Sequence, residues 1–159
     1  MNAKPSNSDQ SYLWFEQSQV LFAVPMDCLQ EVMSVPLLRP LPTSEPALAG
    51  LTTLRNVILP VFNPLLFLDA RSHLAGNSGV VAILKSSDGV CLGLLADRIG
   101  KVITLPALKP LPRSVQQKSV FAGIARIENL SEIFVLDVPQ LAALMGAEEP
   151  NQPSDYIFR

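Results

Sequence analysis

The sequence is poor in charge, histidine and cysteine, and each shortage excludes a class of function. Only 16% of its 159 residues are charged, and twelve basic against fourteen acidic side chains leave a net charge of -2. Because no run of Lys or Arg could neutralise a line of phosphates, we expect no nucleic-acid partner. The single histidine, His73, lies in a polar stretch, which favours a solvated side chain over a base or a ligand. Cys28 and Cys91 stand far apart among apolar neighbours, which predicts buried, reduced thiols.

Long apolar runs are also missing, although 48% of the residues are hydrophobic. The longest clean runs, 80–84 and 90–96, are far shorter than the roughly twenty residues that span a bilayer. Residues 1–11 are polar and contain no apolar signal-peptide core, so we expect a disordered lead-in, no membrane insertion and a cytoplasmic location. A domain of this size has little room for so much apolar side chain, which predicts exposed apolar patches that bind proteins.

Motifs for catalysis or cofactor binding are scarce. No glycine-rich loop precedes a helix in the manner of a phosphate site, and no pair of carboxylates stands out as an acid and base. The sequence Gly76-Asn77-Ser78-Gly79 lacks both the spacing and the preceding strand of a nucleophile elbow. We therefore expect no enzyme, no cofactor and no metal site.

The chain contains instead a series of short strand-like runs separated by turn signals. About ten such runs with a few short helices predict an all-β fold of the barrel or sandwich type. The proline-dense segments 35–46 and 106–112 exclude helices and central strands, so we expect them to run extended over the surface or along a sheet edge. The polar residues 69–79 mark an approximate boundary between two lobes of one domain, 12–147, and residues 148–159 form a tail.

Two helix starts are visible in the sequence. Asn63 followed by Pro64 predicts a cap and a first helical turn. Asp137 predicts a cap for a second helix over 138–145, which Gly146 would end.

A third predicted helix and a hairpin supply the candidate binding residues. Asp27 would start a short helix in which Leu29, Val32 and Met33 share one face and Glu31 lies off it. Residues 50–61 predict a hairpin with Arg55-Asn56 at its turn, because Asn tolerates the left-handed backbone that a tight turn needs. Arg55 is then either an ordinary solvated turn residue or a residue presented to a partner, and these residues alone leave both readings open.

Six segments follow one another in a characteristic order: Phe15-Glu16-Gln17, Val20-Leu21-Phe22-Ala23-Val24-Pro25, Leu29-Gln30-Glu31-Val32, the block from Gly50 to Val61, Leu94-Leu95-Ala96-Asp97-Arg98-Ile99 and Phe134-Val135-Leu136-Asp137-Val138. Their order resembles the CheW family of chemotaxis coupling proteins over about residues 12–145. The resemblance implies two five-stranded SH3-like β-barrel lobes that share an apolar core. It also implies a non-catalytic adaptor that binds the regulatory domain of a CheA-type histidine kinase and the cytoplasmic tip of chemoreceptors, in a swimming, pilus or surface-sensing system.

The same resemblance implies which residues bind partners. Leu29, Glu31 and Val32 fall where the family contacts kinase and receptor. Arg55 matches the arginine of the family's Leu-Arg-Gly turn, Gly50 matches the glycine that opens the preceding strand, and Asn56 replaces the usual glycine beside the presumed contact. The alternative reading is a stand-alone barrel that binds a small ligand in an apolar pocket between the lobes.

Overall fold

A computed structural model of the chain describes residues 10–42, 45–68, 79–112, 120–127 and 132–148. His73, residues 1–9 of the predicted lead-in and residues 149–159 of the predicted tail lie outside this described part. The elements in chain order are β1 (Ser11–Gln17), β2 (Val20–Pro25), the 3-10 turn η2 (Met26–Cys28), β3 (Leu29–Ser34), β4 (Leu48–Leu54), β5 (Val57–Phe62), α1 (Leu65–Leu68), β6 (Val80–Lys85), β7 (Cys91–Ala96), β8 (Arg98–Thr104), β9 (Phe121–Arg126), β10 (Glu132–Leu136) and α2 (Val138–Glu148).

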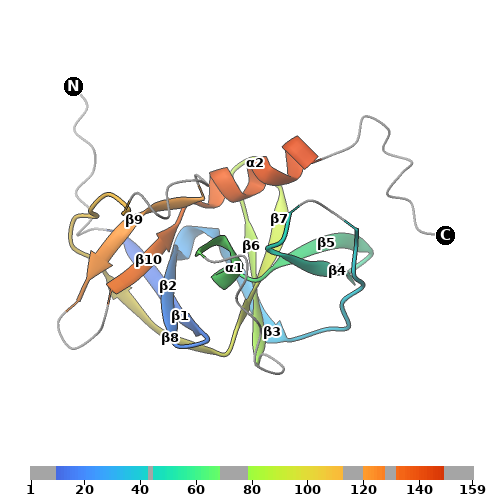
Figure 1. Ribbon diagram of the computed structural model, residues 1–159. Helices are drawn as coiled ribbons and strands as arrows, with labels where there is room; N and C mark the ends of the chain where they lie inside the picture. Colours follow the sequence, from blue (N-terminus) through green and yellow to red (C-terminus); the bar gives the residue numbers. More distant parts are fainter. Residues whose placement is uncertain (1–9, 43–44, 69–78, 113–119, 128–131, 149–159) are drawn as a thin grey trace.

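The strands form two five-stranded sheets, as the family resemblance implies, but the sheets interleave along the chain (Figure 1). Sheet A has the order β8-β1-β2-β10-β9, and sheet B has the order β3-β6-β7-β5-β4. Each sheet therefore combines one hairpin from one half of the sequence with three strands from the other half. The two sets are joined by parallel pairing, β2 with β10 in sheet A and β5 with β7 in sheet B. Residues 69–79 consequently separate two halves of the sequence rather than two sheets.

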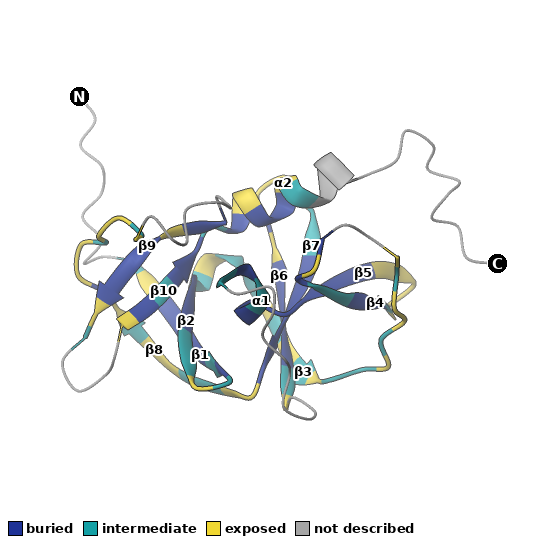
Figure 2. Ribbon diagram, viewed as in Figure 1, coloured by how far each residue is buried: buried dark blue, intermediate teal, exposed yellow. Residues whose placement is uncertain are grey.

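An apolar core is shared by the two sheets, as expected. Figure 2 shows buried residues along the interior strands and exposed ones at the turns and connectors. One cluster joins side chains of both sheets with Val138 and Leu141 of α2, which lies along one side of the molecule, while two smaller clusters belong to sheet A and sheet B alone. Ring contacts with centroid distances of 5.7 to 6.5 Å connect six phenylalanines from both sheets and α1: Phe15, Phe22, Phe62, Phe67, Phe121 and Phe134.

Both predicted helix caps are present. The Asn63 carboxamide oxygen accepts hydrogen bonds from the Leu65 amide at 3.2 Å and from the Gln17 side chain at 3.3 Å, so it starts α1 and links β1 to the end of β5. The Asp137 carboxylate accepts from the Gln140 amide at 3.1 Å and caps α2. This helix continues to Glu148, so the expectation that Gly146 ends it is wrong.

The segment that follows Asp27 is not the predicted helix. Only Met26–Cys28 form a single 3-10 turn, and residues 29–34 form strand β3, which pairs antiparallel with β6. Along β3 the half-buried residues are Leu29, Glu31 and Met33, and they alternate with exposed ones. A period of two rather than 3.6 therefore describes this segment, because pairing with β6 fixes it as an edge strand of sheet B.

The two proline-rich connectors run extended along sheet edges, as predicted. In the first, the backbone N–H and C=O of Arg39 both bond to Leu51 of β4, at 2.8 Å each. In the second, Lys109 makes the same pair of bonds with Ile124 of β9, at 2.8 and 2.9 Å. Gly50 lies directly beneath the first contact, where an added Cβ would stand 2.8 Å from the Arg39 carbonyl oxygen. Gly50 is therefore required for the close approach of the connector to β4.

Candidate partner-binding site

The predicted hairpin turn is present at the tip of β4 and β5. Arg55 and Asn56 both have positive φ, 50° and 67°, as the two central residues of a type I′ turn must. Asn adopts this region readily, whereas an ordinary side chain such as Arg loses roughly 1–2 kcal/mol in it. The turn thus holds an exposed arginine in a fixed, sterically costly backbone conformation.

An ion pair joins this turn to β3. The Arg55 guanidinium donates a 2.6 Å hydrogen bond to the Glu31 carboxylate, with the Arg55 side chain 70% exposed and that of Glu31 32% exposed. Because β3 and β4 are the two edge strands of sheet B, this contact connects opposite edges and helps to close the sheet into a barrel. The hydrogen bond from Arg55 lowers the pKa of Glu31 below its ordinary value, and the same contact raises the pKa of Arg55.

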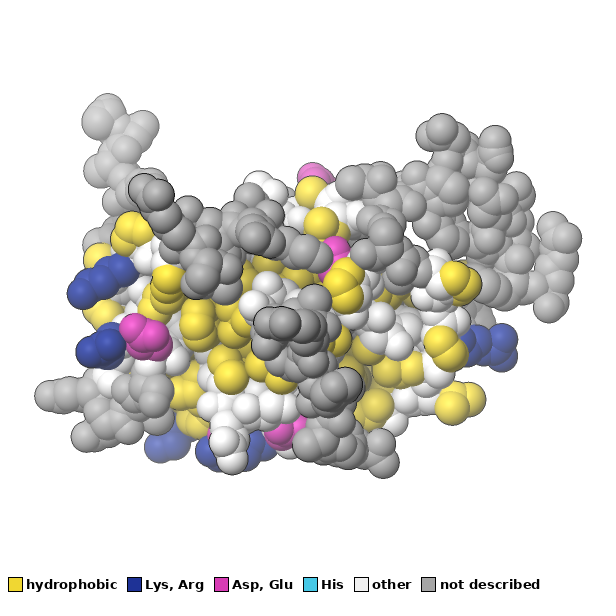
Figure 3. Space-filling view, viewed as in Figure 1, with side chains coloured by type: hydrophobic (Ala, Val, Ile, Leu, Met, Phe, Trp, Pro, Cys, Tyr) yellow, Lys and Arg dark blue, Asp and Glu magenta, His cyan; other side chains and the backbone are white. Residues whose placement is uncertain are grey.

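Two exposed aliphatic side chains follow the turn that carries Arg55. Val57 and Ile58 of β5 are 53% and 44% exposed. Hydrophobic side chains lie next to Lys and Arg side chains at the end of the molecule formed by β4 and β5 (Figure 3). The expectation of exposed apolar side chains is met here, at two positions that no pattern in the sequence marks as candidates.

The structure separates the other residues of the proposed site from this tip. Leu29 pairs with Leu84 and packs against the shared core, whereas a register shift after Leu29 pairs Glu31 with Ile83 on the other face of sheet B. Val32, the next residue in the strand, faces away from Glu31. Gly50 is buried near the other end of β4 from the turn. Only Glu31, Arg55 and Asn56 are therefore brought together, and no local signal reveals the pairing of Glu31 with Arg55 because 24 residues separate them.

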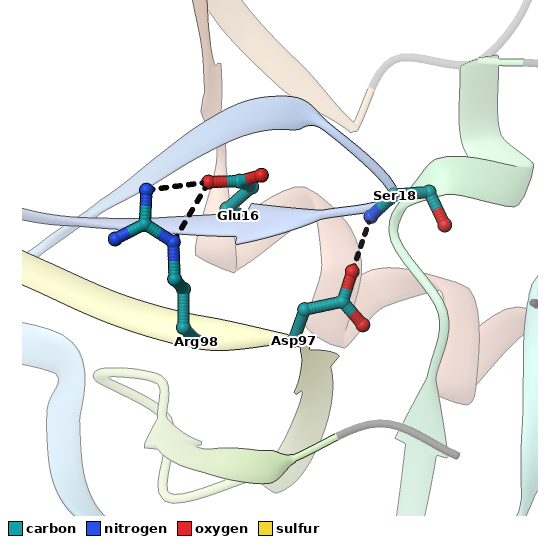
Figure 4. A network of polar contacts seen from close by, with 4 residues as sticks. All are labelled: Glu16, Ser18, Asp97 and Arg98. Atoms are coloured by element: carbon teal, nitrogen blue, oxygen red, sulfur yellow. Dashed lines mark hydrogen bonds and ion pairs between the residues drawn. The ribbon is translucent and has the colours of Figure 1, made fainter. Parts of the chain in front are cut away.

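A second polar network fixes the point where the chain crosses from sheet B to sheet A (Figure 4). Asp97 follows β7 and accepts a 2.7 Å hydrogen bond from the Ser18 amide in the β1–β2 turn. Arg98, the first residue of β8, bonds to the Glu16 carboxylate at 2.8 and 2.9 Å and lies over the Trp14 ring at 5.5 Å. These contacts attach β8 to β1, and they explain the polar Asp97-Arg98 pair in the sequence as structural.

Chemistry of other kinds finds no support in the described residues. Within residues 10–148, gaps excepted, no three His, Cys, Asp or Glu side chains gather to hold a metal, and no helix is long and apolar enough to cross a membrane. Cys28 and Cys91 are free thiols, as expected, but both are only partly buried. Desolvation, followed by the charges of Asp27 and Asp137, raises the pKa of Cys28, so this thiol is not activated.

The fold is thus two interleaved five-stranded sheets with a charged and partly apolar hairpin tip. Residues 11–145 match the CheW-like domain, and the chain belongs to this family, which makes it a chemotaxis scaffold or adaptor. The fold is similar to that in the crystal structure of the scaffolding protein TtCheW from Thermoanaerobacter tengcongensis, with a TM-score of 0.67 and 18% sequence identity over 86% of this chain and 87% of that chain. No curated protein matches the chain.

Proposed function

We propose that this chain is a non-catalytic adaptor that couples chemoreceptors to a CheA-type histidine kinase by binding the regulatory domain of the kinase and the cytoplasmic tip of the receptors. Family membership supports the adaptor role. The observation that carries the finer proposal is the Glu31–Arg55 pair at the hairpin tip, beside exposed Val57 and Ile58. Apolar contact supplies area for binding, and charges at its rim fix register and partner choice.

The geometry suits Arg55 for contact with a partner. Its guanidinium has five donors in a planar fork, and the ion pair with Glu31 leaves the side chain 70% exposed. Glu31 holds the guanidinium over the edge of sheet B, which reduces the side-chain entropy lost when a partner carboxylate binds. Arg55 is thus the contact residue of this proposal and Glu31 the residue that orients it.

The test is binding of the purified chain to the CheA-type kinase and the receptor signalling region of its source cell. Arg55→Ala and Glu31→Lys should each raise Kd about tenfold, which corresponds to roughly 1.4 kcal/mol. Arg126→Ala is the matched control, because Arg126 forms a similar exposed ion pair with Glu132 on sheet A, at 3.2 Å and with the arginine 75% exposed. Unchanged affinity for both partners in both hairpin variants would refute the assignment.

A charge swap separates a contact role from a structural one. The double variant Glu31→Arg with Arg55→Glu keeps an ion pair between β3 and the turn but reverses the charge presented at the tip. If Arg55 binds a partner, this variant keeps its stability and loses affinity. Retention of wild-type affinity would show that the pair serves only to close the barrel.

A further inference from the structure

The two proline-rich connectors are near copies of each other. The first strap, residues 36–42, contains Leu38-Arg39-Pro40-Leu41-Pro42, and the second strap, residues 106–112, contains Leu108-Lys109-Pro110-Leu111-Pro112. Each is pinned by two backbone hydrogen bonds to a strand at the edge of its sheet, β4 or β9. The same arrangement, an extended proline-rich segment held by two backbone hydrogen bonds, therefore occurs on sheet B and on sheet A.

The first strap is held in a polyproline-like conformation by its own sequence. Proline fixes its own φ near -65°, and the residue before a proline is driven to the extended region. Arg39-Pro40-Leu41-Pro42 therefore consists of four consecutive restricted residues. Burial supports a left-handed helix with three residues per turn, since Leu38 and Leu41 are partly buried while Leu37 and Pro40, also three apart, are exposed.

Two of the three faces of this helix are open, and they carry distinct chemistry. Leu37 and Pro40 form an apolar ridge, and Leu37 is 84% exposed, more than any other large hydrophobic side chain of the described chain. Arg39 and Pro42 form the second face, and both are exposed. Within the described residues the Arg39 guanidinium takes part in no ion pair. The backbone of Arg39 is thus held by Leu51, while its exposed guanidinium is available to bind another molecule.

We propose that the first strap is a second docking surface, a built-in proline-type ligand for a partner protein whose groove is lined by aromatic side chains and bordered by a carboxylate. Aromatic grooves bind such helices because the ligand is already ordered and loses little entropy. The ridge of Leu37 and Pro40 fills the groove, and the carboxylate pairs with Arg39. This inference does not depend on the Glu31–Arg55 site.

The second strap provides an internal comparison. It has the same anchoring and the same period-three burial, but Ala107 stands in place of Leu37 and Lys109 in place of Arg39. Alanine offers less apolar area than leucine, and lysine lacks the planar fork of arginine. We therefore expect the partner to select the first strap over the second.

Site-specific photo-crosslinking in the source cell tests the proposal. The full-length chain would carry p-benzoylphenylalanine at position 37 or, as matched control, at position 107, and the linked peptides would be sequenced by mass spectrometry. We expect one protein linked at position 37, through a segment with aromatic and acidic residues. The yield should fall at least fivefold with Arg39→Glu, and likewise at position 107, where the photoreactive residue stands beside Lys109 instead of Arg39. It should be unaffected by Arg55→Ala.

Equal yields at positions 37 and 107, an unchanged yield with Arg39→Glu, or links confined to a second copy of this chain would overturn the proposal. A failure of Arg55→Ala to change receptor or kinase binding would count only against the hairpin site. Both strap positions are solvent-exposed, so folding of the variants can be verified by an unchanged thermal midpoint.

Discussion

Replacement of Gly50 by alanine should detach the first strap from sheet B. The added Cβ would lie 2.8 Å from the Arg39 carbonyl oxygen and 3.1 Å from the Leu38 Cβ, and neither atom belongs to the end of a flexible side chain. The strap must therefore move, and the two 2.8 Å bonds between Arg39 and Leu51 are lost. At roughly 0.5–1.5 kcal/mol for each net hydrogen bond, the free energy of unfolding should fall by about 1–3 kcal/mol. For a domain of this size that lowers Tm by roughly 3–10 °C.

Urea unfolding and amide hydrogen exchange measure the two parts of this effect. Gly50→Ala should accelerate exchange at the Arg39 and Leu51 amides, whose bonds are broken. Gly89→Ala is the control for glycine chemistry, because nothing lies within 4 Å of an added Cβ there and only its φ of +87° is unfavourable. It should lower stability and leave exchange at both amides unchanged. Wild-type exchange rates at Arg39 and Leu51 in Gly50→Ala would refute the reasoning.

Three further outcomes are expected. In an NMR titration, Arg55→Ala should raise the pKa of Glu31 toward its ordinary value. In the wild type the ion pair is fully formed at pH values above that ordinary pKa, and it is lost as the pH falls through the lowered pKa. An unchanged pKa of Glu31 in the variant would contradict the contact. Phe22→Ala should lower the free energy of unfolding by about 3–5 kcal/mol in urea, because Phe22 is fully buried against three phenylalanine rings, and a loss below about 1 kcal/mol would argue against this packing. Asn56→Gly should change stability by less than about 0.5 kcal/mol, because both residues accept a φ of 67°, whereas Asn56→Val should cost roughly 1–2 kcal/mol.

Features with a local physical cause could be predicted from the sequence. The caps at Asn63 and Asp137 and the turn at Arg55-Asn56 depend on short-range hydrogen bonding or on backbone preference within a few residues. The extended connectors likewise follow from proline alone. At these positions the local preference agrees with the tertiary structure, so the pattern of a few adjacent residues is sufficient to find them.

The error at residues 29–34 has a different cause. Leu29, Val32 and Met33 fit a helical face, whereas the half-buried residues of the strand are Leu29, Glu31 and Met33 and include a glutamate. A register shift after Leu29 turns this residue to the shared core, while Met33 packs within sheet B. The strand is formed because β6 pairs with it, and the glutamate is accommodated because Arg55 meets it at 2.6 Å. Both partners are remote in the sequence, so a six-residue window contains no information that would choose between the two periods.

The interleaved topology explains why the candidate site cannot be understood from one half of the sequence. Glu31 and Arg55 both precede residue 69, yet in sheet B their strands are not neighbours: β6 and β7 of the second half lie between β3 and β5. Among the described strands β3 pairs only with β6, and the β4–β5 hairpin reaches the rest of the sheet through β7. The 2.6 Å contact is therefore set by strands that contribute no residue to it. An isolated first half of the chain would contain both charged residues but lack the strands that bring them together. Substitutions of residues in β6 or β7 should therefore alter partner binding, although these residues do not themselves contact the partner.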